Sequence, residues 1–304
     1  MNFRRVETIL IIAFLLVNVF LLSTYYNRSD MNYAATDNEI INLVREMENQ
    51  NIQLPEFTEE EYELPYLQAD EHNLLSENAS RLSDQTGNVN QDGSLYSSIL
   101  SNPVALSGEA QLTEEDRVRL DAFIQSDQVL FGDQYVLFQY QPNSQRIIYT
   151  QAVNGAPIAD GTSSITLHMD SAGQVISYEQ TFAGPMTAQG TAHPLITDRT
   201  AVELLFQNNE IPSGATVARP VLTYYRTLAL EDLSMYAPAW YVRIQTDSGV
   251  EEIRVDAING SIITELPAPP TIRERREEDE SDTSDSTDES ASTEPTSVKM
   301  GFKE

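Results

Sequence analysis

The pattern of hydrophobic and polar residues divides the chain into an apolar start, a long middle region of periodic segments and a polar end. Near the start, the residues from Ile9 to Leu22 are apolar except for Asn18. Together with the residues on either side, the segment 8–26 would reach roughly 28 Å as a helix at about 1.5 Å per residue. A bilayer has a hydrocarbon core of about 30 Å. The pattern therefore predicts a transmembrane helix over residues 8–26.

The residues that follow this helix favour an anchor that is retained over a signal peptide that is removed. The stretch LLSTYYNRSDMNY contains tyrosines, an arginine and an aspartate in place of the small residues of a cleavage site. Arg4 and Arg5 precede the helix, whereas Arg28 stands alone after it in an acidic context. The positive-inside rule then places residues 1–7 in the cytoplasm as a short stub and the rest of the chain outside the cell. A cleavable signal peptide is the alternative.

Three segments have the period of amphipathic helices, namely residues 37–49, 112–125 and 195–209. The second has Thr113 as its N-cap and Asp116 in the position of a capping-box acid, and the third has a candidate cap at Thr197. The residues predicted to face inward are Ile40, Ile41, Leu43, Val44 and Met47 in the first helix, Val118, Leu120, Phe123 and Ile124 in the second, and Ala201, Leu204 and Leu205 in the third.

The remaining ordered segments alternate apolar and polar residues and are rich in β-branched and aromatic side chains, which is typical of antiparallel strands. These segments lie at residues 62–70, 134–155, 164–182, 217–230, 237–246 and 251–266. Residues 77–94, rich in Ser, Asn, Asp and Gly, predict a loop. A helix followed by strands occurs twice, so the pattern predicts an α+β fold of two related units, over residues 27–190 and 191–266.

A weak internal repeat supports the two-unit interpretation. ITLHMDSAGQVI (165–176) and IRVDAINGSII (253–263) both alternate apolar residues and then turn at a glycine, Gly173 or Gly260. The spacing from the first isoleucine to the glycine differs by one residue. A tight hairpin turn that needs a positive φ explains why glycine occupies both positions.

Composition narrows the possible partners and compartments. The net charge of -29 makes nucleic acid an improbable partner, because no Lys/Arg cluster offsets the excess of acids. The chain contains no cysteine and therefore no disulfide framework. Residues 267–304 are dominated by acids, serines and threonines, which predicts a disordered acidic tail.

Candidate catalytic and metal-binding residues are few. The three histidines, His72, His168 and His193, have no partner at metal-ligand spacing, and neither H-E-x-x-H nor G-x-S-x-G occurs. We therefore predict no catalytic residue, no cofactor site and no metal site. A wall-modifying hydrolase is the least favoured of the alternatives.

Two further groups have structural interpretations. The acidic run Glu59–Glu61 lacks the pattern of a calcium loop and predicts a solvated face. Trp240 and Tyr241 follow the alternation of a strand and predict core or cross-strand aromatic contacts, with a ligand platform as the second choice.

Two stretches resemble a known family. The opening MNFRRVETILIIAFLLVNVFLL resembles the start of YycI proteins, and PAWYVRI with IRVDAINGSII is similar to the strand pair of PepSY-type modules. The resemblance implies an N-terminal transmembrane helix followed by two PepSY-like helix-plus-antiparallel-sheet units. It also implies a non-enzymatic regulator of the YycG/WalK sensor histidine kinase of low-GC Gram-positive bacteria, which acts with a YycH-like paralogue at the cell membrane and affects cell-wall homeostasis. The long acidic tail departs from the resemblance. A PepSY-like inhibitor or chaperone of a secreted protease is the alternative.

The predicted anchor offers a candidate surface for a partner helix. Phe14, Asn18, Leu21 and Tyr25 share one helical face. An interhelical hydrogen bond from an amide in the bilayer contributes about 0.6 to 2 kcal/mol. Because the cytoplasmic stub is too short for a docking domain, a signal would have to pass through helix contacts in the membrane or through the outer part of a partner. A polar residue that the helix merely tolerates is the alternative explanation of Asn18.

Overall fold

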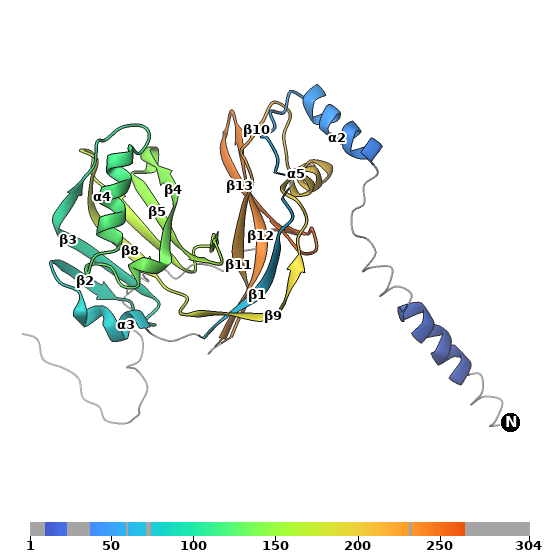
Figure 1. Ribbon diagram of the computed structural model, residues 1–304, viewed down its shortest axis with the longest axis horizontal. Helices are drawn as coiled ribbons and strands as arrows, with labels where there is room; N and C mark the ends of the chain where they lie inside the picture. Colours follow the sequence, from blue (N-terminus) through green and yellow to red (C-terminus); the bar gives the residue numbers. More distant parts are fainter. Residues whose placement is uncertain (1–9, 23–36, 59, 71–73, 231–232, 265–304) are drawn as a thin grey trace, which may run out of the picture. The chain divides into compact units, whose positions relative to one another are not determined.

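Two antiparallel sheets, each covered by a helix on one face, make up most of the protein (Figure 1). The structure is a computed structural model that describes residues 10–22, 37–58, 60–70, 74–230 and 233–264, with residues 37–42 described by their backbone alone. Both sheets belong to one unit of the chain, Met1–Thr271. This arrangement confirms the prediction of a mixed fold with antiparallel sheets.

Sheet I is formed by a continuous stretch of the chain, in the strand order β2-β3-β8-β7-β5-β4. Its strands are β2 (Gln85–Val89), β3 (Leu95–Ala105), β4 (Tyr135–Gln141), β5 (Arg146–Val153), β7 (Ser164–Met169) and β8 (Gln174–Thr181), and the short β6 (Ala156–Pro157) pairs with β5. Helix α4 (Glu114–Ile124) packs on one face through Leu120, Phe123 and Ile124. The opposite face carries mostly polar side chains, as is common where an antiparallel sheet covers a core on one side only.

Sheet II is assembled from distant parts of the chain, in the order β14-β13-β12-β1-β9, with β10 and β11 also paired to β12. Its strands are β1 (Glu63–Asp70), β9 (Met186–Pro194), β10 (Thr216–Val217), β11 (Val221–Ala229), β12 (Leu233–Thr246), β13 (Gly249–Asp256) and β14 (Ile262–Ile263). Helices α5 (Asp198–Gln207) and α2 (Asp37–Asn49) contribute Leu205 and Met47 to the core beneath this sheet. Four short helical segments lie between these elements: α3 (Leu74–Asn78), η1 (Ala79–Arg81), η2 (Gly132–Gln134) and η3 (Pro142–Ser144).

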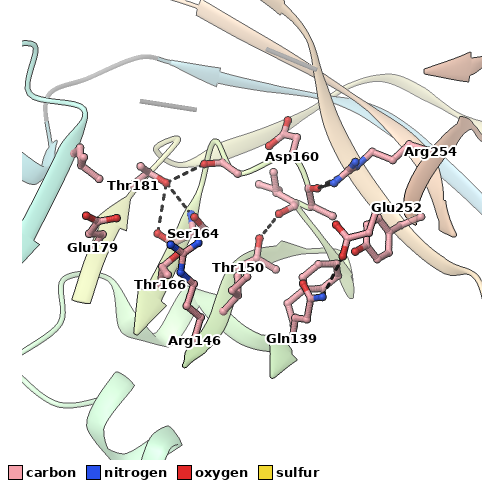
Figure 2. Close-up of a pocket in the computed structure, with 17 residues that line it drawn as sticks. Gln139, Arg146, Thr150, Asp160, Ser164, Thr166, Glu179, Thr181, Glu252 and Arg254 are labelled. Carbon is pink, nitrogen blue, oxygen red and sulfur yellow. Dashed lines mark hydrogen bonds between the residues drawn. The ribbon is translucent and has the colours of Figure 1, made fainter. Parts of the chain in front are cut away.

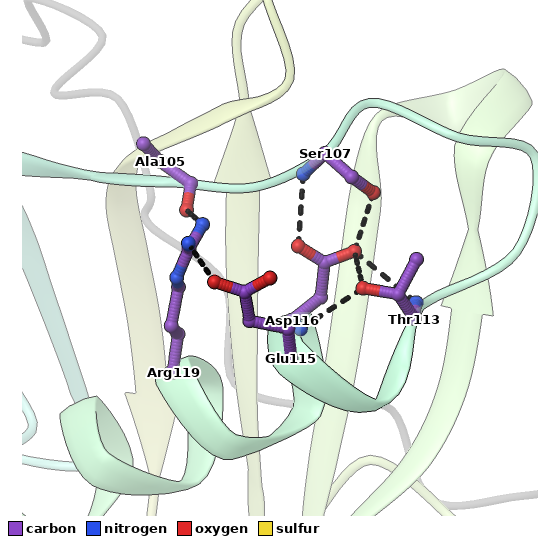
Figure 3. Close-up of polar contacts among 6 residues, drawn as sticks. All are labelled: Ala105, Ser107, Thr113, Glu115, Asp116 and Arg119. Carbon is purple, nitrogen blue, oxygen red and sulfur yellow. Dashed lines mark hydrogen bonds and ion pairs between the residues drawn. The ribbon is translucent and has the colours of Figure 1, made fainter.

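The N-terminus of α4 is held by the capping box that the sequence predicts (Figure 3). The Thr113 hydroxyl accepts a hydrogen bond from the Asp116 backbone N–H at 3.1 Å, and the Thr113 backbone N–H donates to Asp116 Oδ2 at 3.1 Å. Asp116 also accepts hydrogen bonds from the backbone N–H and the hydroxyl of Ser107. The carboxylate therefore ties the start of the helix to the loop that precedes it.

The two turns of the internal repeat have the same construction. Asp170 accepts hydrogen bonds from the backbone N–H groups of residues 172 and 174, and Gly173 follows with a φ of 76°. Asp256 accepts from the backbone N–H groups of residues 258 and 259, and Gly260 follows with a φ of 74°. An aspartate that organises the turn, followed by a left-handed glycine, is the shared element behind the sequence repeat.

Several local predictions are confirmed and some are wrong. The helices at 37–49, 112–125 and 195–209 and the strands of the predicted set are present, with shifted ends. The predicted loop over residues 77–94 is wrong in part, because it contains η1 and β2, which forms an edge strand by pairing with β3. Val118 is also wrong as an inward residue: its side chain is 61 % exposed, because α4 turns residues 120, 123 and 124 toward the sheet.

Sheet II combines strands that lie far apart in the sequence. Strand β1, which lies within the predicted first unit 27–190, is hydrogen-bonded to β9 and β12 of sheet II. Sheet II therefore draws strands from both sides of sheet I in the sequence. The division into domains at residues 190 and 191 stays a prediction.

The N-terminal apolar segment is helical over residues 10–22, with its side chains exposed. Among the residues that the structure describes, no helix has both the length and the apolarity needed to cross a membrane. The ends of the predicted span 8–26 and the predicted tail 267–304 lie outside the described residues. The transmembrane helix and the acidic tail stay predictions.

Candidate functional site

The candidate site is a recess of about 490 Å³ between the polar face of sheet I and strands β12 and β13 of sheet II (Figure 2). Such a volume lies in the range of about 300 to 1,000 Å³ typical of small-ligand sites. The residues that line the recess are Leu95, Phe138, Gln139, Arg146, Ile148, Thr150, Ile158, Ala159, Asp160, Gly161, Ser164, Thr166, Glu179, Thr181, Tyr241, Glu252 and Arg254.

The wall from sheet I carries a cation, a hydroxyl and an anion on three neighbouring strands. Thr166 of β7 is directly opposite Glu179 of β8 and Ile148 of β5 in the strand register. Arg146 lies two residues before Ile148 on β5 and on the same face, and Figure 2 shows Arg146, Thr166 and Glu179 facing the same recess. The alternation of strand residues places all three on the face opposite the α4 core.

Hydrogen bonds and a ring contact hold the wall from sheet II in place. The Arg254 guanidinium donates from Nε and Nη2 to the carbonyl oxygen of Ala159, and its carbon Cζ lies 5.0 Å from the centre of the Tyr241 ring. Gln139 Nε2 donates to Glu252 Oε1 at 3.1 Å, and the Phe138 and Tyr241 rings are 5.2 Å apart. These contacts join β4 of sheet I to β12 and β13 of sheet II.

The segment from Ile158 to Asp160 connects the two sheets at one end of the recess. The Ile158 backbone N–H donates to the carbonyl of residue 151 in sheet I at 2.8 Å, and the Ala159 backbone N–H donates to the carbonyl of Tyr224 in sheet II at 3.0 Å. Asp160 is 6 % exposed and accepts hydrogen bonds from the Thr162 backbone N–H and hydroxyl and from the Arg226 backbone N–H. The hydrogen-bonding groups of residues 158–160 therefore connect the two sheets.

Burial and neighbouring charges set the protonation of the sheet II wall. Burial raises the pKa of the Tyr241 phenol above its usual value, and the Glu252 carboxylate raises it further. Tyr241 is therefore a neutral phenol at neutral pH. Burial lowers the pKa of the Arg254 guanidinium, while the charges of Tyr241, Glu252 and Asp160 act in the opposite direction.

The two described histidines, His168 and His193, lie in different sheets. His168 Nε2 lies 3.8 Å from Glu179 Oε2 on the polar face of sheet I. The His193 ring in β9 contacts the Tyr66 ring edge to face, with centroids 5.3 Å apart. His72 lies outside the described residues. Within the described part of the chain, no group of three or more histidines, cysteines or acids is placed so that it could hold a metal ion.

The predicted core aromatics are confirmed. Trp240 is 2 % exposed, and its Nε1 donates to the carbonyl of Ile196 at 2.8 Å. Tyr241 is 3 % exposed and also lines the recess. In the predicted acidic run, Glu60 and Glu61 are exposed, as a solvated face requires, and residue 59 is outside the described part.

The predicted partner-binding face is described in part. Phe14, Asn18 and Leu21 are exposed residues of the helix over 10–22, and Tyr25 lies outside the described residues. Asn18 Nδ2 donates to the carbonyl oxygen of Phe14 at 2.8 Å. The amide therefore satisfies one of its N–H groups within its own helix.

Sequence reasoning missed the recess altogether. The pattern around three of its charged residues is the ordinary alternation of a strand with one solvated face. These residues are Arg146, Glu179 and Arg254. No spacing in the sequence links β5 to β8 or to β13. The strand register and the contact between the sheets bring these residues together.

The chain belongs to a known family. Residues 31–258, most of the 304-residue chain, match the family described as "YycI protein", so the chain is a member of the YycI family. The match confirms the resemblance found in the sequence. The helix over residues 10–22 precedes the matched region.

Other comparisons are more distant. No curated protein matches the chain. A crystal structure of an uncharacterized protein from Eubacterium rectale is similar with 12 % sequence identity and a TM-score of 0.39, covering 70 % of this chain and 88 % of that one. The Bacillus megaterium YpeB C-terminal domain is similar with 10 % identity and a TM-score of 0.33, covering 75 % of this chain and 95 % of that one. Similarity at this level does not establish a shared function.

Proposed function

We propose that this protein is a membrane-anchored, non-enzymatic regulator of a sensor histidine kinase of the YycG/WalK type, and that it thereby affects cell-wall homeostasis. The observation that carries the proposal is membership of the YycI family over residues 31–258. The partners in this proposal are the kinase and a YycH-like paralogue, both at the cell membrane.

In this proposal the segment 8–26 spans the membrane once, with its N-terminus in the cytoplasm and the two sheets outside the cell. Support comes from the apolar run, from Arg4 and Arg5 before it, and from the exposed side chains of residues 10–22. In this proposal the protein contacts the kinase through the membrane helix and through the two sheets outside the cell.

Asn18 is the proposed centre of the helix contact, on the face with Phe14, Leu21 and Tyr25. Its Nδ2 already donates to the Phe14 carbonyl, which lowers the cost of placing the amide in hydrocarbon. The amide still has an acceptor oxygen and a second N–H to offer to another helix. An interhelical hydrogen bond of about 0.6 to 2 kcal/mol corresponds to roughly three- to thirtyfold in affinity.

The proposed regulation is tested with the full-length protein and the kinase reconstituted together in liposomes. We expect the rate of kinase autophosphorylation to change when the protein is present. An unchanged rate, together with no association of the two proteins by fluorescence energy transfer, would contradict the proposed function.

The proposed helix contact is tested with Asn18→Leu, which should weaken association with the kinase roughly three- to thirtyfold. The matched control is the double variant Asn18→Leu with Leu16→Asn, which keeps the composition of the helix but moves the amide to the opposite face. It should behave like Asn18→Leu. If both variants associate as the wild type does, the helix is an anchor and nothing more.

A further inference from the structure

We propose that the recess between sheets I and II binds a short zwitterionic peptide, with its amine facing Glu179 and its carboxylate facing Arg146. Binding of such a ligand goes beyond the proposed regulation of a kinase and does not depend on it. The proposal rests on which charges of the recess are already used by the fold and which are not.

The charges on the sheet II side of the recess are engaged. Arg254 donates to the carbonyl of Ala159, and Glu252 accepts from Gln139. Asp160 accepts hydrogen bonds from Thr162 and Arg226. These three side chains hold the two sheets together, so they form a structural wall.

The charges on the sheet I side are available to a ligand. Among the residues that the structure describes, no carboxylate lies within 4.0 Å of the Arg146 guanidinium, which is exposed. The Glu179 side chain is 44 % exposed, and within the described part of the chain its ionic neighbour is His168, at 3.8 Å. A cation and an anion thus stand in the same recess without being paired to each other.

Their separation defines the length of the ligand. Arg146 and Glu179 lie on β5 and β8, with β7 between them, and Arg146 is opposite His168 whereas Glu179 is opposite Thr166, two residues away along β7. Two strand spacings of about 4.8 Å and a step of about 7 Å along the strands therefore separate their backbones by about 12 Å. An extended chain advances about 3.4 Å per residue, so about three to four residues bridge this distance. A free tripeptide carries an amine at one end and a carboxylate at the other.

The lining around the two charges suits a peptide. Thr166 lies between Arg146 and Glu179, one strand from each, and can exchange a hydrogen bond with a peptide amide. Ile148 on β5, Phe138 on the flanking strand β4 and Leu95 on the flanking strand β3 provide apolar surface for small side chains. The few polar groups would orient the ligand, and the apolar groups would supply the area buried on binding.

The test uses trialanine as the probe and the full-length protein in detergent, with binding measured by calorimetry and by saturation-transfer NMR. We expect trialanine to bind, and we expect N-acetyl-trialanine and trialanine amide to bind about tenfold more weakly, since each lacks one charge-assisted contact. Equal affinity for the free and the capped peptides, or no binding of trialanine at all, would overturn the proposal.

Two variants assign each end of the peptide. Arg146→Gln should weaken the binding of trialanine about tenfold and leave the binding of trialanine amide, which has no carboxylate, unchanged. Glu179→Gln should also weaken the binding of trialanine about tenfold, and it should leave the binding of N-acetyl-trialanine, which has no free amine, unchanged. The matched controls are Arg81→Gln and Glu77→Gln, because these exposed residues lie outside the recess and should alter neither affinity.

Both sites of substitution accept polar residues, so the variants should keep the thermal unfolding midpoint of the wild type, which is measured alongside binding. A variant that weakens free and capped peptides equally would overturn the assigned orientation. A neutral ligand provides the remaining arm: if chitotetraose binds and trialanine does not, the recess is a saccharide site and the peptide proposal is wrong.

Discussion

Helices α4 and α5 each cover one sheet and each bury a carboxylate, but the two carboxylates differ in their hydrogen bonds. Asp116 of α4 is 1 % exposed and accepts hydrogen bonds from Ser107 and Thr113. Glu203 of α5 is 6 % exposed, and its Oε1 has no hydrogen-bond partner among the described residues.

The comparison shows that partners, more than burial, decide whether a buried acid supports the fold. Burial acts to raise the pKa of Asp116, but the hydrogen bonds from Ser107 and Thr113 outweigh it and lower that pKa to about 2. Burial raises the pKa of Glu203, and the nearby Arg199 offsets only part of the effect. The ionised form is therefore stabilised by the fold in α4 and disfavoured by it in α5.

The largest expected effect comes from the buried leucines through which each helix packs on its own sheet. Leu120 of α4 and Leu205 of α5 are both fully buried. We expect Leu120→Ala and Leu205→Ala each to lower the free energy of unfolding by about 2 to 5 kcal/mol, because each leaves a cavity between helix and sheet. Chemical denaturation followed by circular dichroism measures the loss.

The same pair of variants tests whether the two helix-covered sheets unfold together. Coincident transitions in both variants would indicate one cooperative unit. A separate early transition that shifts with Leu120→Ala and not with Leu205→Ala would support the predicted division into two domains. The exposed Val118→Ala is the control and should change the free energy of unfolding by less than about 0.5 kcal/mol.

The second effect concerns the satisfied carboxylate. Asp116→Ala should lower the free energy of unfolding by about 1 to 3 kcal/mol at pH 7, because it removes the capping box and leaves the donors of Ser107 and Thr113 without an acceptor. The measurement is denaturation at a series of pH values.

The pH dependence has a definite sign. The pKa of Asp116 is lower in the folded protein, about 2, than its usual value, so its contribution is present above about pH 4 and is lost as the pH falls toward 2. The difference in stability between the wild type and Asp116→Ala should narrow over this window. A difference that is constant from pH 7 to pH 2 would show that the ionised carboxylate is not what stabilises α4.

The smallest effect has the opposite direction. Glu203→Gln should raise the free energy of unfolding at pH 7 by roughly 0.5 to 1 kcal/mol, because a neutral amide costs less to bury than a carboxylate. Since the pKa of Glu203 is raised in the folded protein, the disadvantage of the wild type should disappear as the pH falls below the usual range of a glutamate. The control is Glu251→Gln, which replaces an exposed carboxylate and should change the free energy of unfolding little. A loss of stability in Glu203→Gln would contradict this account.

Local signals in the sequence were sufficient for the helices and most strands. Thr113 and Thr197 mark the starts of α4 and α5, because side-chain capping depends on residues a few positions apart. The turn glycines Gly173 and Gly260 were identifiable for the same reason. These features need no knowledge of the rest of the chain.

Features that depend on distant contacts could not be predicted. Residues 77–94 have a loop composition, yet β2 forms there because β3 provides a neighbouring strand. Gly87 within β2 is also explained by a distant contact, because a Cβ at this position would clash with the Tyr96 hydroxyl oxygen, 2.1 Å away. The recess is a stronger case, since Arg146 and Glu179 belong to different hairpins and Arg254 belongs to the other sheet. No local sequence pattern predicts that these three residues line the same recess.

The position of β1 has a consequence for how the chain folds. All the strands of sheet I lie between residues 85 and 181, so this sheet can form from one continuous stretch. Strand β1 (Glu63–Asp70) precedes that stretch, but its neighbours β9 (Met186–Pro194) and β12 (Leu233–Thr246) follow it. Closing so long a loop is entropically costly and slows folding. We expect sheet I to form first, and β1 to stay unpaired until β9 and β12, which follow sheet I in the sequence, pair with it.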